Sequence, residues 1–259
     1  MSATRVIFVS GANQGLGMHT VRQLASTPDV LVFMGSRKLA AAEEALATFA
    51  SEVHPSSSVV PLQLDITDAA SVQNAHNFVS KTLKERNLPG LDVLINKCVT
   101  RVSFFQDRTK TSTSAGIASA GPLEIYATNV LGTANLKDAL CPLLTQRGSS
   151  AILNISSSLG SNTLFTHRPP TLSTSYLWYS TSKAALNSLT VQWALEEEEK
   201  GSGIRVVSIC PGMNATRINN YTDFGGDPKD GVKVIVKEAL LANEGRTAVF
   251  IHKDGVYPW

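Results

Sequence analysis

Tyr179 and Lys183 place a phenol and an ammonium four residues apart in the segment Tyr179-Ser-Thr-Ser-Lys183. This spacing is about one helical turn, so both side chains lie on one face if the segment is helical. A free phenol ionises near pH 10, and a neighbouring cation stabilises the phenolate. The pair therefore favours proton exchange with a bound substrate, although such a pair alone is common and usually carries no chemistry.

A glycine-rich turn, Ser10-Gly-Ala-Asn-Gln-Gly-Leu-Gly17, follows an apolar strand-like segment and precedes a helical pattern. Glycine tolerates the positive φ of a tight turn, and its missing Cβ lets backbone amides approach a phosphate. The N-terminus of the helix that follows favours a pyrophosphate. This context predicts a dinucleotide site. The predicted contacts are Gly11, Asn13, Gln14, Gly15, Leu16 and Gly17.

The second apolar segment ends in Gly35-Ser-Arg-Lys38, which contains no acidic residue. NAD sites usually place a carboxylate there for the ribose 2′-hydroxyl, whereas the 2′-phosphate of NADP needs a cation. The planar donors of Arg37 suit a phosphate. We therefore expect NADP(H) as the cofactor, although an exposed arginine that merely opens a helix would look the same in the sequence.

Apolar runs of strand length alternate with helical patterns along the chain, which is typical of βαβ units and of a parallel sheet covered on both faces. The predicted strands are 5–10, 30–35, 59–64, 93–96, 151–156, 205–210 and 248–251. The predicted helices are 16–26, 40–52, 69–87, 124–144, 178–198 and 231–242. We therefore expect one α/β domain over residues 1–259, built on a doubly wound, seven-stranded parallel sheet. Its ligand should bind at the carboxyl ends of the strands.

Charge and composition exclude several classes of partner. The chain has 23 Lys and Arg against 21 Asp and Glu, a formal charge of +2, which is too balanced for binding to a phosphate backbone. No apolar stretch has the length of a membrane span or the pattern of a signal peptide. The three cysteines and five histidines show no spacing typical of disulfide frameworks or zinc sites. We expect a cytoplasmic protein with no nucleic-acid, membrane or metal partner.

The spacing Gly-x-x-x-Gly-x-Gly at residues 11–17 resembles the fingerprint of the short-chain dehydrogenase/reductase family, with Ser10 in place of a threonine. The segment Asn154-Ile-Ser-Ser-Ser-Leu-Gly160 is similar to the family's Asn-x-Ser-Ser-x-x-Gly. The Tyr179 to Lys183 pair and the closing segment 245–259 continue the resemblance, the latter to members of carbonyl-reductase type. The resemblance covers essentially the whole chain. It implies a Rossmann-type fold and an oxidoreductase that uses a nicotinamide dinucleotide.

The resemblance implies four catalytic residues. Tyr179 would donate a proton to the developing alkoxide, and Ser157 would position the substrate oxygen. Lys183 would bind the nicotinamide ribose and, with the oxidised ring, lower the pKa of the phenol by about 2. Asn129, in Tyr126-Ala-Thr-Asn-Val-Leu-Gly132, would hold a water beside the lysine. Tyr179 and Lys183 would therefore also contact the cofactor.

Further cofactor contacts follow from the same resemblance. Asp65 and the amide of Ile66 would meet the adenine, and Asn96 ends the fourth predicted strand beside the nucleotide channel. The segment Pro211-Gly-Met-Asn-Ala-Thr216 is similar to the family's Pro-Gly-x-x-x-Thr, whose backbone and threonine hold the nicotinamide carboxamide. The predicted contacts there are Pro211, Gly212, Asn214 and Thr216.

Two departures from the family pattern bear on function. Asn96-Lys-Cys-Val99 stands where the family has Asn-Asn-Ala-Gly, and a β-branched residue disfavours the positive φ that glycine allows. Ser157 and Tyr179 are 22 residues apart, a longer interval than in many relatives. This insertion leaves open whether the chain is a monomer or a homo-oligomer. Substrate lids are expected near 97–121, 159–176 and 214–230.

Together the motifs predict an NADPH-dependent reductase that transfers hydride to a carbonyl or imine of a bulky small molecule. Two alternatives stay open. One is a natural-product tailoring enzyme that catalyses a cofactor-assisted rearrangement or cyclisation, and the other is a non-catalytic NADP-binding protein. The complete set of catalytic residue types favours reduction, whereas the departure at residues 96–99 favours altered chemistry.

Overall fold

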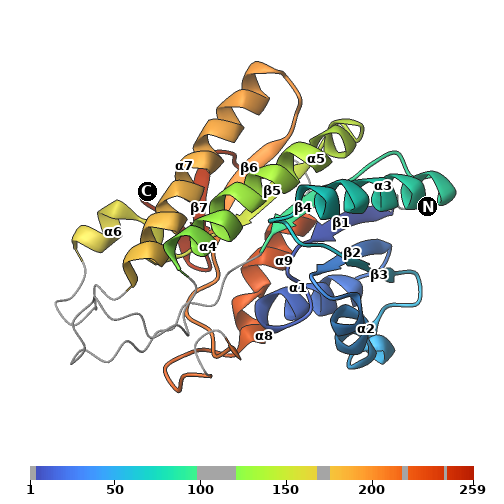
Figure 1. Cartoon of the computed structure of the whole chain (residues 1–259), viewed down its shortest axis with the longest axis horizontal. Coiled ribbons are helices and arrows are strands. Elements are labelled where there is room, and N and C mark those ends of the chain that lie inside the picture. Colours follow the sequence, from blue (N-terminus) through green and yellow to red (C-terminus); the bar gives the residue numbers. More distant parts are fainter. Residues whose placement is uncertain (1–3, 98–120, 168–175, 218–220, 242–243) are drawn as a thin grey trace.

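The computed structural model describes residues 4–97, 121–167, 176–217, 221–241 and 244–259 (Figure 1). Its strands are β1 (Arg5–Val9), β2 (Val30–Ser36), β3 (Ser58–Gln63), β4 (Val93–Asn96), β5 (Ala151–Ile155), β6 (Arg205–Cys210), β7 (Val249–His252) and β8 (Gly255–Tyr257). The longer helices are α1 (Gly15–Ala25), α2 (Leu39–Ala47), α3 (Ala69–Glu85), α5 (Thr133–Thr145), α7 (Leu177–Glu199) and α9 (Lys233–Leu240). Shorter elements are α4 (Pro122–Tyr126), α6 (Asn162–Thr166), α8 (Pro228–Gly231), η1 (Ala50–Glu52), η2 (Ala127–Gly132) and η3 (Ser158–Gly160).

The strands form one sheet in the order β3-β2-β1-β4-β5-β6-β7-β8. Strands β1 to β7 pair in parallel, and β8 pairs antiparallel with β7. This confirms the predicted doubly wound α/β fold. The predicted strand count of seven is wrong by one, because the chain turns back after β7 and adds a three-residue strand at the edge.

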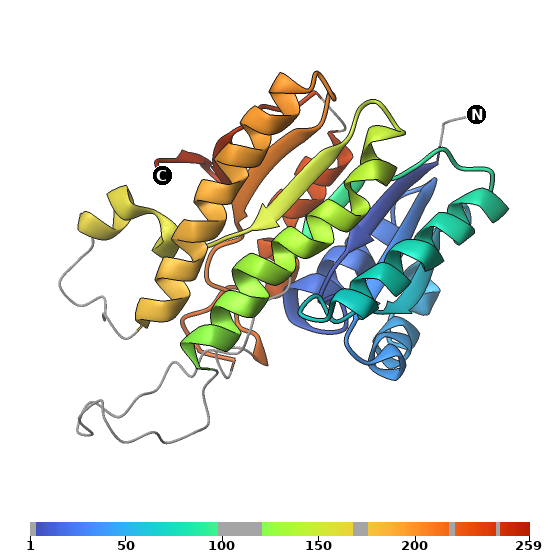
Figure 2. The same ribbon diagram turned by 45° about the horizontal axis from the view of Figure 1, so that its top comes forward.

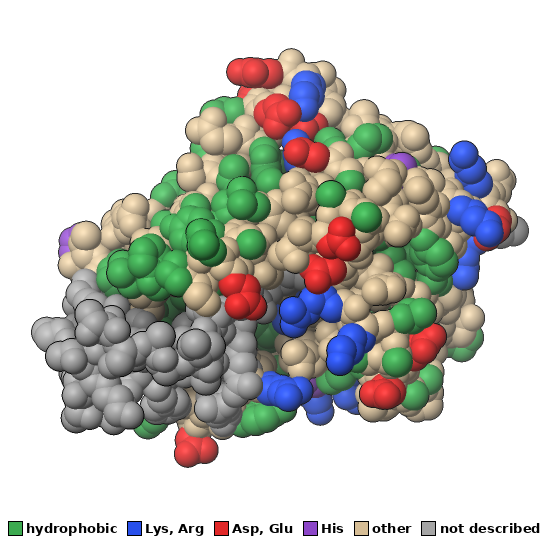
Figure 3. Space-filling model, viewed as in Figure 1, with side chains coloured by type: hydrophobic (Ala, Val, Ile, Leu, Met, Phe, Trp, Pro, Cys, Tyr) green, Lys and Arg blue, Asp and Glu red, His purple; other side chains and the backbone are tan. Residues whose placement is uncertain are grey.

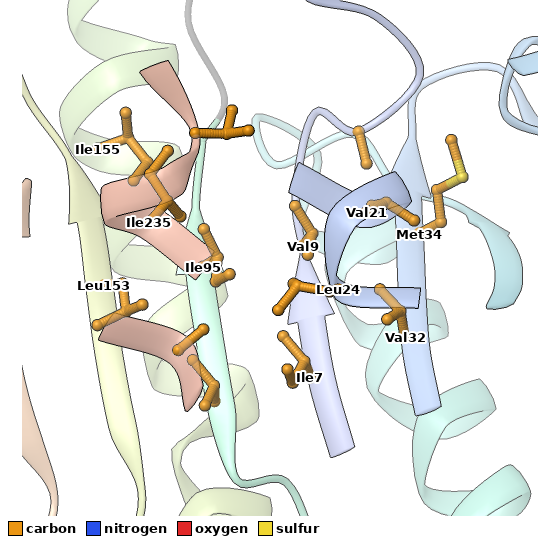
Figure 4. Packing of buried hydrophobic residues seen from close by; sticks show 14 of the residues in the cluster. Ile7, Val9, Val21, Leu24, Val32, Met34, Ile95, Leu153, Ile155 and Ile235 are labelled. Carbon is orange, nitrogen blue, oxygen red and sulfur yellow. The ribbon is translucent and has the colours of Figure 1, made fainter. Parts of the chain in front are cut away.

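Helices cover both faces of the sheet (Figures 1 and 2). Successive residues of a strand point to opposite faces, so Ile7 and Val9 of β1 pack with α1, α2 and α9, while Val6 and Phe8 pack with α3, α5 and α7. Figure 4 shows Ile7 and Val9 with Leu24 of α1 in the first of these two clusters. Because both faces are covered, the strands need the continuous apolar character seen in the sequence.

Three predicted helices are interrupted. The predicted helix 124–144 divides into α4, a π-helical turn (η2) and α5, while 40–52 ends early and continues as η1. Within the predicted helix 231–242, residue 231 belongs to α8, and a separate helix, α9, begins at Lys233 and covers most of the remainder. At the first break, a Cβ on Gly132 would lie 2.8 Å from Cγ1 of Ile66, so only glycine allows this part of the chain to pack so closely against the segment after β3.

The predicted lids are described only in part. Residues 98–120, 168–175 and 218–220 lie outside the described ranges, and with them Cys98 and Val99. The described part of 159–176 contains the end of η3 and helix α6, and the segment 214–230 ends within α8. Within the described ranges, no helix is both long and apolar enough to cross a membrane. The same residues include no group of three or more His, Cys, Asp or Glu arranged to hold a metal ion.

Candidate active site

The carboxyl ends of the central parallel strands bring the predicted site segments to one edge of the sheet. The glycine turn follows β1, Asn96 ends β4, Ser157 follows β5 and Pro211 follows β6. The chain reverses its direction of strand addition between β1 and β4, which are neighbours in the sheet. Open α/β sheets bind ligands at such a switch point. The topology therefore gathers segments that are far apart in the sequence.

Tyr179 and Lys183 both lie near the start of α7, as their spacing predicts. The Lys183 Nζ atom lies 5.8 Å from the centroid of the Tyr179 ring. The Tyr179 phenol forms a hydrogen bond with the Ser157 side chain, which stands at the start of η3. The structure therefore brings three of the four predicted catalytic side chains together.

Lys183 is buried, and its ammonium group donates a hydrogen bond to the Ile155 carbonyl at 2.8 Å. The turn that carries Ser157 packs directly on this part of α7. A Cβ on Gly160 would lie 2.7 Å from the carbonyl carbon of Lys183, so only glycine allows this approach. Gly160 thus lets the Ser157 turn approach the helix that carries the phenol and the amine.

Burial raises the pKa of Tyr179 to about 12, while its hydrogen bond with Ser157 lowers it and the electrostatic effect of Cys210 raises it. Among these causes, desolvation disfavours the phenolate more than the hydrogen bond with Ser157 favours it. The lowering of the pKa by Lys183 together with the oxidised ring stays a prediction. The neutral phenol is a proton donor throughout the neutral pH range. A cationic nicotinamide would have to offset this desolvation before the phenol could act as a base.

The raised pKa of Tyr179 predicts a loss of stability at alkaline pH. In the unfolded chain the phenol ionises near pH 10, whereas in the folded chain it holds its proton to about pH 12. The folded state therefore binds more protons in this window, and its stability falls as the pH rises through it. In urea unfolding from about pH 9 to about pH 11.5, wild type should lose more unfolding free energy than Tyr179→Phe. Parallel curves for the two proteins would contradict this assignment.

Asn129 lies in the π-helical turn η2, and its side chain is fully buried. Its Nδ2 atom donates to the Ser182 hydroxyl at 3.0 Å, and that hydroxyl donates to the Tyr179 carbonyl at 2.7 Å. Asn129 is therefore joined to the catalytic helix through Ser182. The sequence reasoning missed Ser182, although its place three residues after Tyr179, on the same helical face, was a usable signal.

The glycine turn has the backbone that its composition predicts. Gly11 and Gly15 have φ values of 60° and 54°, in the left-handed region that favours glycine. A Cβ on Gly17 would lie 2.3 Å from the Gly11 carbonyl oxygen. Gln14 precedes α1 without a side-chain cap, and the first turn of α1 carries no acidic residue. The helix dipole and the uncapped amides at this N-terminus are thus suited to an anion.

The Pro211–Thr216 loop lies against this turn. A Cβ on Gly15 would lie 3.6 Å from the Thr216 side chain, so any larger residue would occupy the space between them. Asn214 is turned into its own loop, where its amide donates to the carbonyls of Pro211 and Gly212 at 3.0 and 2.9 Å. The turn and the loop together form a cradle of glycine and backbone groups that fits a dinucleotide.

The remaining predicted contacts of the glycine turn differ in exposure. Gln14 is exposed and Asn13 is partly exposed, so both can be reached by a ligand at the start of α1. Leu16 is partly buried and packs against the core cluster below α1. Its contact with a nucleotide therefore stays a prediction, as do those of the other two.

Arg37 and Asp65 lie near each other at the ends of β2 and β3. Arg37 is exposed, and Asp65 accepts hydrogen bonds from the amide and hydroxyl of Thr67 at 2.9 and 2.6 Å. Burial raises the pKa of Asp65, but the Thr67 hydrogen bonds and the charge of Arg37 outweigh it, so the pKa is lowered overall. Ile66 is buried beside them. This end of the cradle offers an exposed guanidinium next to an ionised carboxylate.

Asn96 joins two strands of the sheet. Its Nδ2 atom donates to Oδ1 of Asn154 at 2.9 Å, and Asn154 in turn donates to the Thr190 hydroxyl of α7 at 2.9 Å. The buried Oδ1 atom of Asn96 has no hydrogen-bond partner among the described residues. Asn96 therefore ties β4 to β5, and within the described part of the chain its acceptor is left unused at the carboxyl end of β4.

Cys210 is a further residue of this edge that the sequence reasoning missed. It ends β6, is buried, and its Sγ atom accepts a hydrogen bond from the Ser158 amide at 3.2 Å. It also influences the Tyr179 phenol electrostatically. Its place directly before Pro211 was the only signal in the sequence, and a lone cysteine there is usually a small buried hydrophobe.

Known proteins that are similar to this chain in sequence or fold include dehydrogenases and reductases. Residues 5–223 match the family model for short chain dehydrogenases. The chain is 30% identical to an uncharacterized oxidoreductase of Schizosaccharomyces pombe, over 99% of this chain and 93% of that protein. It is 29% identical to the short-chain dehydrogenase anuI of Penicillium roqueforti, over 90% of this chain and 88% of that protein.

A solved structure is similar along the whole chain. The NADPH-bound carbonyl reductase from chicken fatty liver has 28% sequence identity and a TM-score of 0.73, and the match covers 99% of this chain and 100% of that one. The family model spans most of the chain, including the glycine turn and the Tyr179 to Lys183 pair. The chain therefore belongs to the short-chain dehydrogenase family and is an oxidoreductase of that type, related to carbonyl reductases.

Proposed function

We propose that the protein is an NADPH-dependent reductase acting on a carbonyl or imine of a bulky small molecule. The observation that carries this proposal is the hydrogen bond between the Tyr179 phenol and Ser157, with Lys183 close by. A protonated phenol beside a hydroxyl donor suits a substrate oxygen that gains negative charge during reduction. When bound, the nicotinamide supplies the hydride.

The residues of the chain divide the remaining work. Ser157 holds the substrate oxygen, and Tyr179 donates its proton to that oxygen as it becomes an alkoxide. Lys183 is fixed by the Ile155 carbonyl beside the phenol, where it can hold the nicotinamide ribose. Asn129 of η2 is linked to α7 through Ser182. A water held by Asn129 beside Lys183 would return a proton to the Tyr179 phenol. These are the roles that the family resemblance implies, and the contacts of the four side chains support them.

The preference for NADP(H) rests on Arg37. It is exposed at the end of β2, and no acidic residue stands between Gly35 and Lys38 to accept from a ribose 2′-hydroxyl. A guanidinium binds a phosphate through paired, charge-assisted hydrogen bonds. The NADPH-bound state of the similar chicken carbonyl reductase supports the same choice.

Arg37→Ala is expected to raise the dissociation constant of NADPH about tenfold, the effect of losing a charge-assisted contact. The affinity for NADH should stay unchanged, because NADH lacks the 2′-phosphate. Quenching of protein fluorescence by each nucleotide measures both constants. Lys81→Ala is the matched control, because it removes one exposed cation from α3, away from the cradle. Equal losses of NADPH and NADH affinity in Arg37→Ala would contradict the assignment.

The substrate class is supported by the surface around the reaction centre. Leu177 and Trp178, next to Tyr179, and Leu123 of α4 are exposed apolar side chains. On the face seen in Figure 3, hydrophobic side chains gather over α4 and α7. Such a surface favours a large apolar substrate over a small polar one.

The proposal is tested by following NADPH absorbance with a panel of bulky aromatic ketones, quinones and cyclic imines. We expect oxidation of NADPH with at least one member and formation of the matching alcohol or amine. Product isomers without NADPH oxidation would indicate the non-redox alternative instead. Tight NADPH binding with no product from any member would favour the non-catalytic alternative, and either result would overturn the proposal.

Two further predictions from the sequence accompany this proposal. The single catalytic domain over residues 1–259 and the cytoplasmic location both stay predictions. The oligomeric state also stays open, because the interval between Ser157 and Tyr179 is long. Sedimentation of the purified protein would measure the last of these directly.

A further inference from the structure

Strand β8 and the two residues after it (the β8 segment, residues 255–259) contact the short helix α6. The Ser161 hydroxyl donates to the Pro258 carbonyl at 2.7 Å, although the two residues are 97 positions apart. The Thr163 amide donates to the Trp259 carbonyl at 3.1 Å. Ser161 is fully buried. These contacts join the edge of the sheet to the segment that begins at Ser157.

The β8 segment is held to the sheet by aromatic packing of its own. The Trp259 ring stacks on Phe250 of β7, with ring centroids 5.6 Å apart and an interplanar angle of 14°. Tyr257 meets the same Phe250 ring edge-on at 5.6 Å. Phe250 is fully buried. The segment is therefore held to the sheet by pairing with β7 and by ring packing, in addition to its contacts with α6.

Two other elements, α7 and β6, also form hydrogen bonds with the turn between Ser157 and Ser161. Asn187 of α7 donates to the Gly160 carbonyl at 3.2 Å, and the Ser158 amide donates to Cys210 at the end of β6. The hydrogen bond of Ser161 with the β8 segment is the third contact that holds this turn. The Ser157 hydroxyl thus faces Tyr179 from a turn held by α7, β6 and the β8 segment together.

We propose that the β8 segment is a positioning element of the active site. It holds Ser161 and α6 so that the Ser157 turn keeps its place and α6 borders the space for the substrate. The hydrogen bonds and ring contacts of the segment join it to β7 and α6 rather than to the glycine turn, so it acts on substrate binding rather than on nucleotide binding. This inference rests on the proposed carbonyl reduction for its kinetic consequence, while its structural consequence can be measured independently.

Trp259→Ala is the decisive variant, because it removes the stacked ring and leaves the Ser161 cap on the Leu164 amide in place. We expect the KM for the carbonyl substrate to rise about fivefold, as the loss of one aromatic contact predicts. The kcat should fall by less than the KM rises, because Asn187 and Cys210 still hold the Ser157 turn, and the NADPH dissociation constant should stay unchanged. Amide hydrogen exchange, followed by mass spectrometry, should become faster in residues 157–167.

Two further variants serve as controls. Trp259→Phe retains an aromatic ring against Phe250 and should restore the wild-type KM and exchange. Phe78→Ala removes an aromatic side chain from the surface of α3, outside the β8 segment, and should change neither. Ser161→Ala removes the other half of the anchor, and its effect on KM should combine less than additively with that of Trp259→Ala, because both act on one contact region.

The outcomes separate this inference from the proposed function. Faster exchange in residues 157–167 of Trp259→Ala supports the anchor even if no panel member is reduced by wild type, in which case only the proposed function fails. Unchanged exchange in that segment overturns the positioning role. A substrate KM that stays at the wild-type value in an active Trp259→Ala enzyme overturns it as well. If Trp259→Ala does not fold, the exchange and KM of Trp259→Leu decide the question in the same way, because this variant also loses the stacked ring, keeps an apolar side chain and leaves the Ser161 cap in place.

Discussion

Tyr179→Phe is expected to lower kcat for carbonyl reduction by about 10³-fold, within the range that a positioned proton donor contributes. The phenyl ring occupies the same volume but has no proton to give to the developing alkoxide. The raised pKa of the phenol keeps it protonated at neutral pH, so wild type always has the donor available. Stopped-flow measurement of NADPH oxidation under single-turnover conditions reports this step directly.

Binding of NADPH should be nearly unchanged in Tyr179→Phe, because the glycine turn and the Thr216 loop form the cradle without the phenol oxygen. Tyr126→Phe removes the same atom from a tyrosine of α4 and should retain wild-type turnover. Wild-type turnover in Tyr179→Phe would refute the assigned proton donor. Loss of NADPH binding in this variant would show instead that the phenol mainly supports the nucleotide.

Gly17→Ala is expected to weaken NADPH binding by about 10- to 100-fold, since overpacking of this kind typically costs about 1–3 kcal/mol. The added Cβ would lie 2.3 Å from the Gly11 carbonyl oxygen and 2.9 Å from the Ala12 Cα. Both neighbours are backbone atoms, so the turn itself must move. Titration calorimetry with NADPH measures the loss, and a lower Tm should accompany it.

Gly121→Ala is the matched control for Gly17→Ala. Gly121 has a φ of −65°, which alanine adopts easily, and no atom of the described residues lies within 4 Å of its missing Cβ. This variant should bind NADPH as wild type does. An unchanged NADPH affinity in Gly17→Ala would mean that the turn does not approach the pyrophosphate. The glycine turn would then not be the binding site of the dinucleotide.

Most of the sheet could be predicted from local pattern. The strand segments are continuous apolar runs because helices cover both faces, and their parallel pairing follows from the alternation with helices. The edge strand β8 escaped prediction because only three residues form it and their pairing depends on the turn after His252. Tyr257 and Trp259 pack on Phe250 only because that hairpin returns along β7.

The candidate site was predictable in composition but not in its connections. The four-residue interval between Tyr179 and Lys183 places both on one helical face whatever the rest of the fold. In contrast, Ser182 and Cys210 became visible only through their contacts with Asn129 and Ser158. Such contacts join residues that the sequence separates by 53 and 52 positions, so no local pattern reports them.

By itself, the amino-acid sequence determined the alternating fold, the glycine turn at the start of α1 and the phenol and amine on one face of α7. These depend on spacing within one element or on neighbouring elements. The tertiary structure alone decided the raised pKa of Tyr179, the π-helical turn at Asn129 and the support of Ser161 by the β8 segment. Burial and long-range contacts exist only after the elements have packed, which is why these features could not be read from the chain.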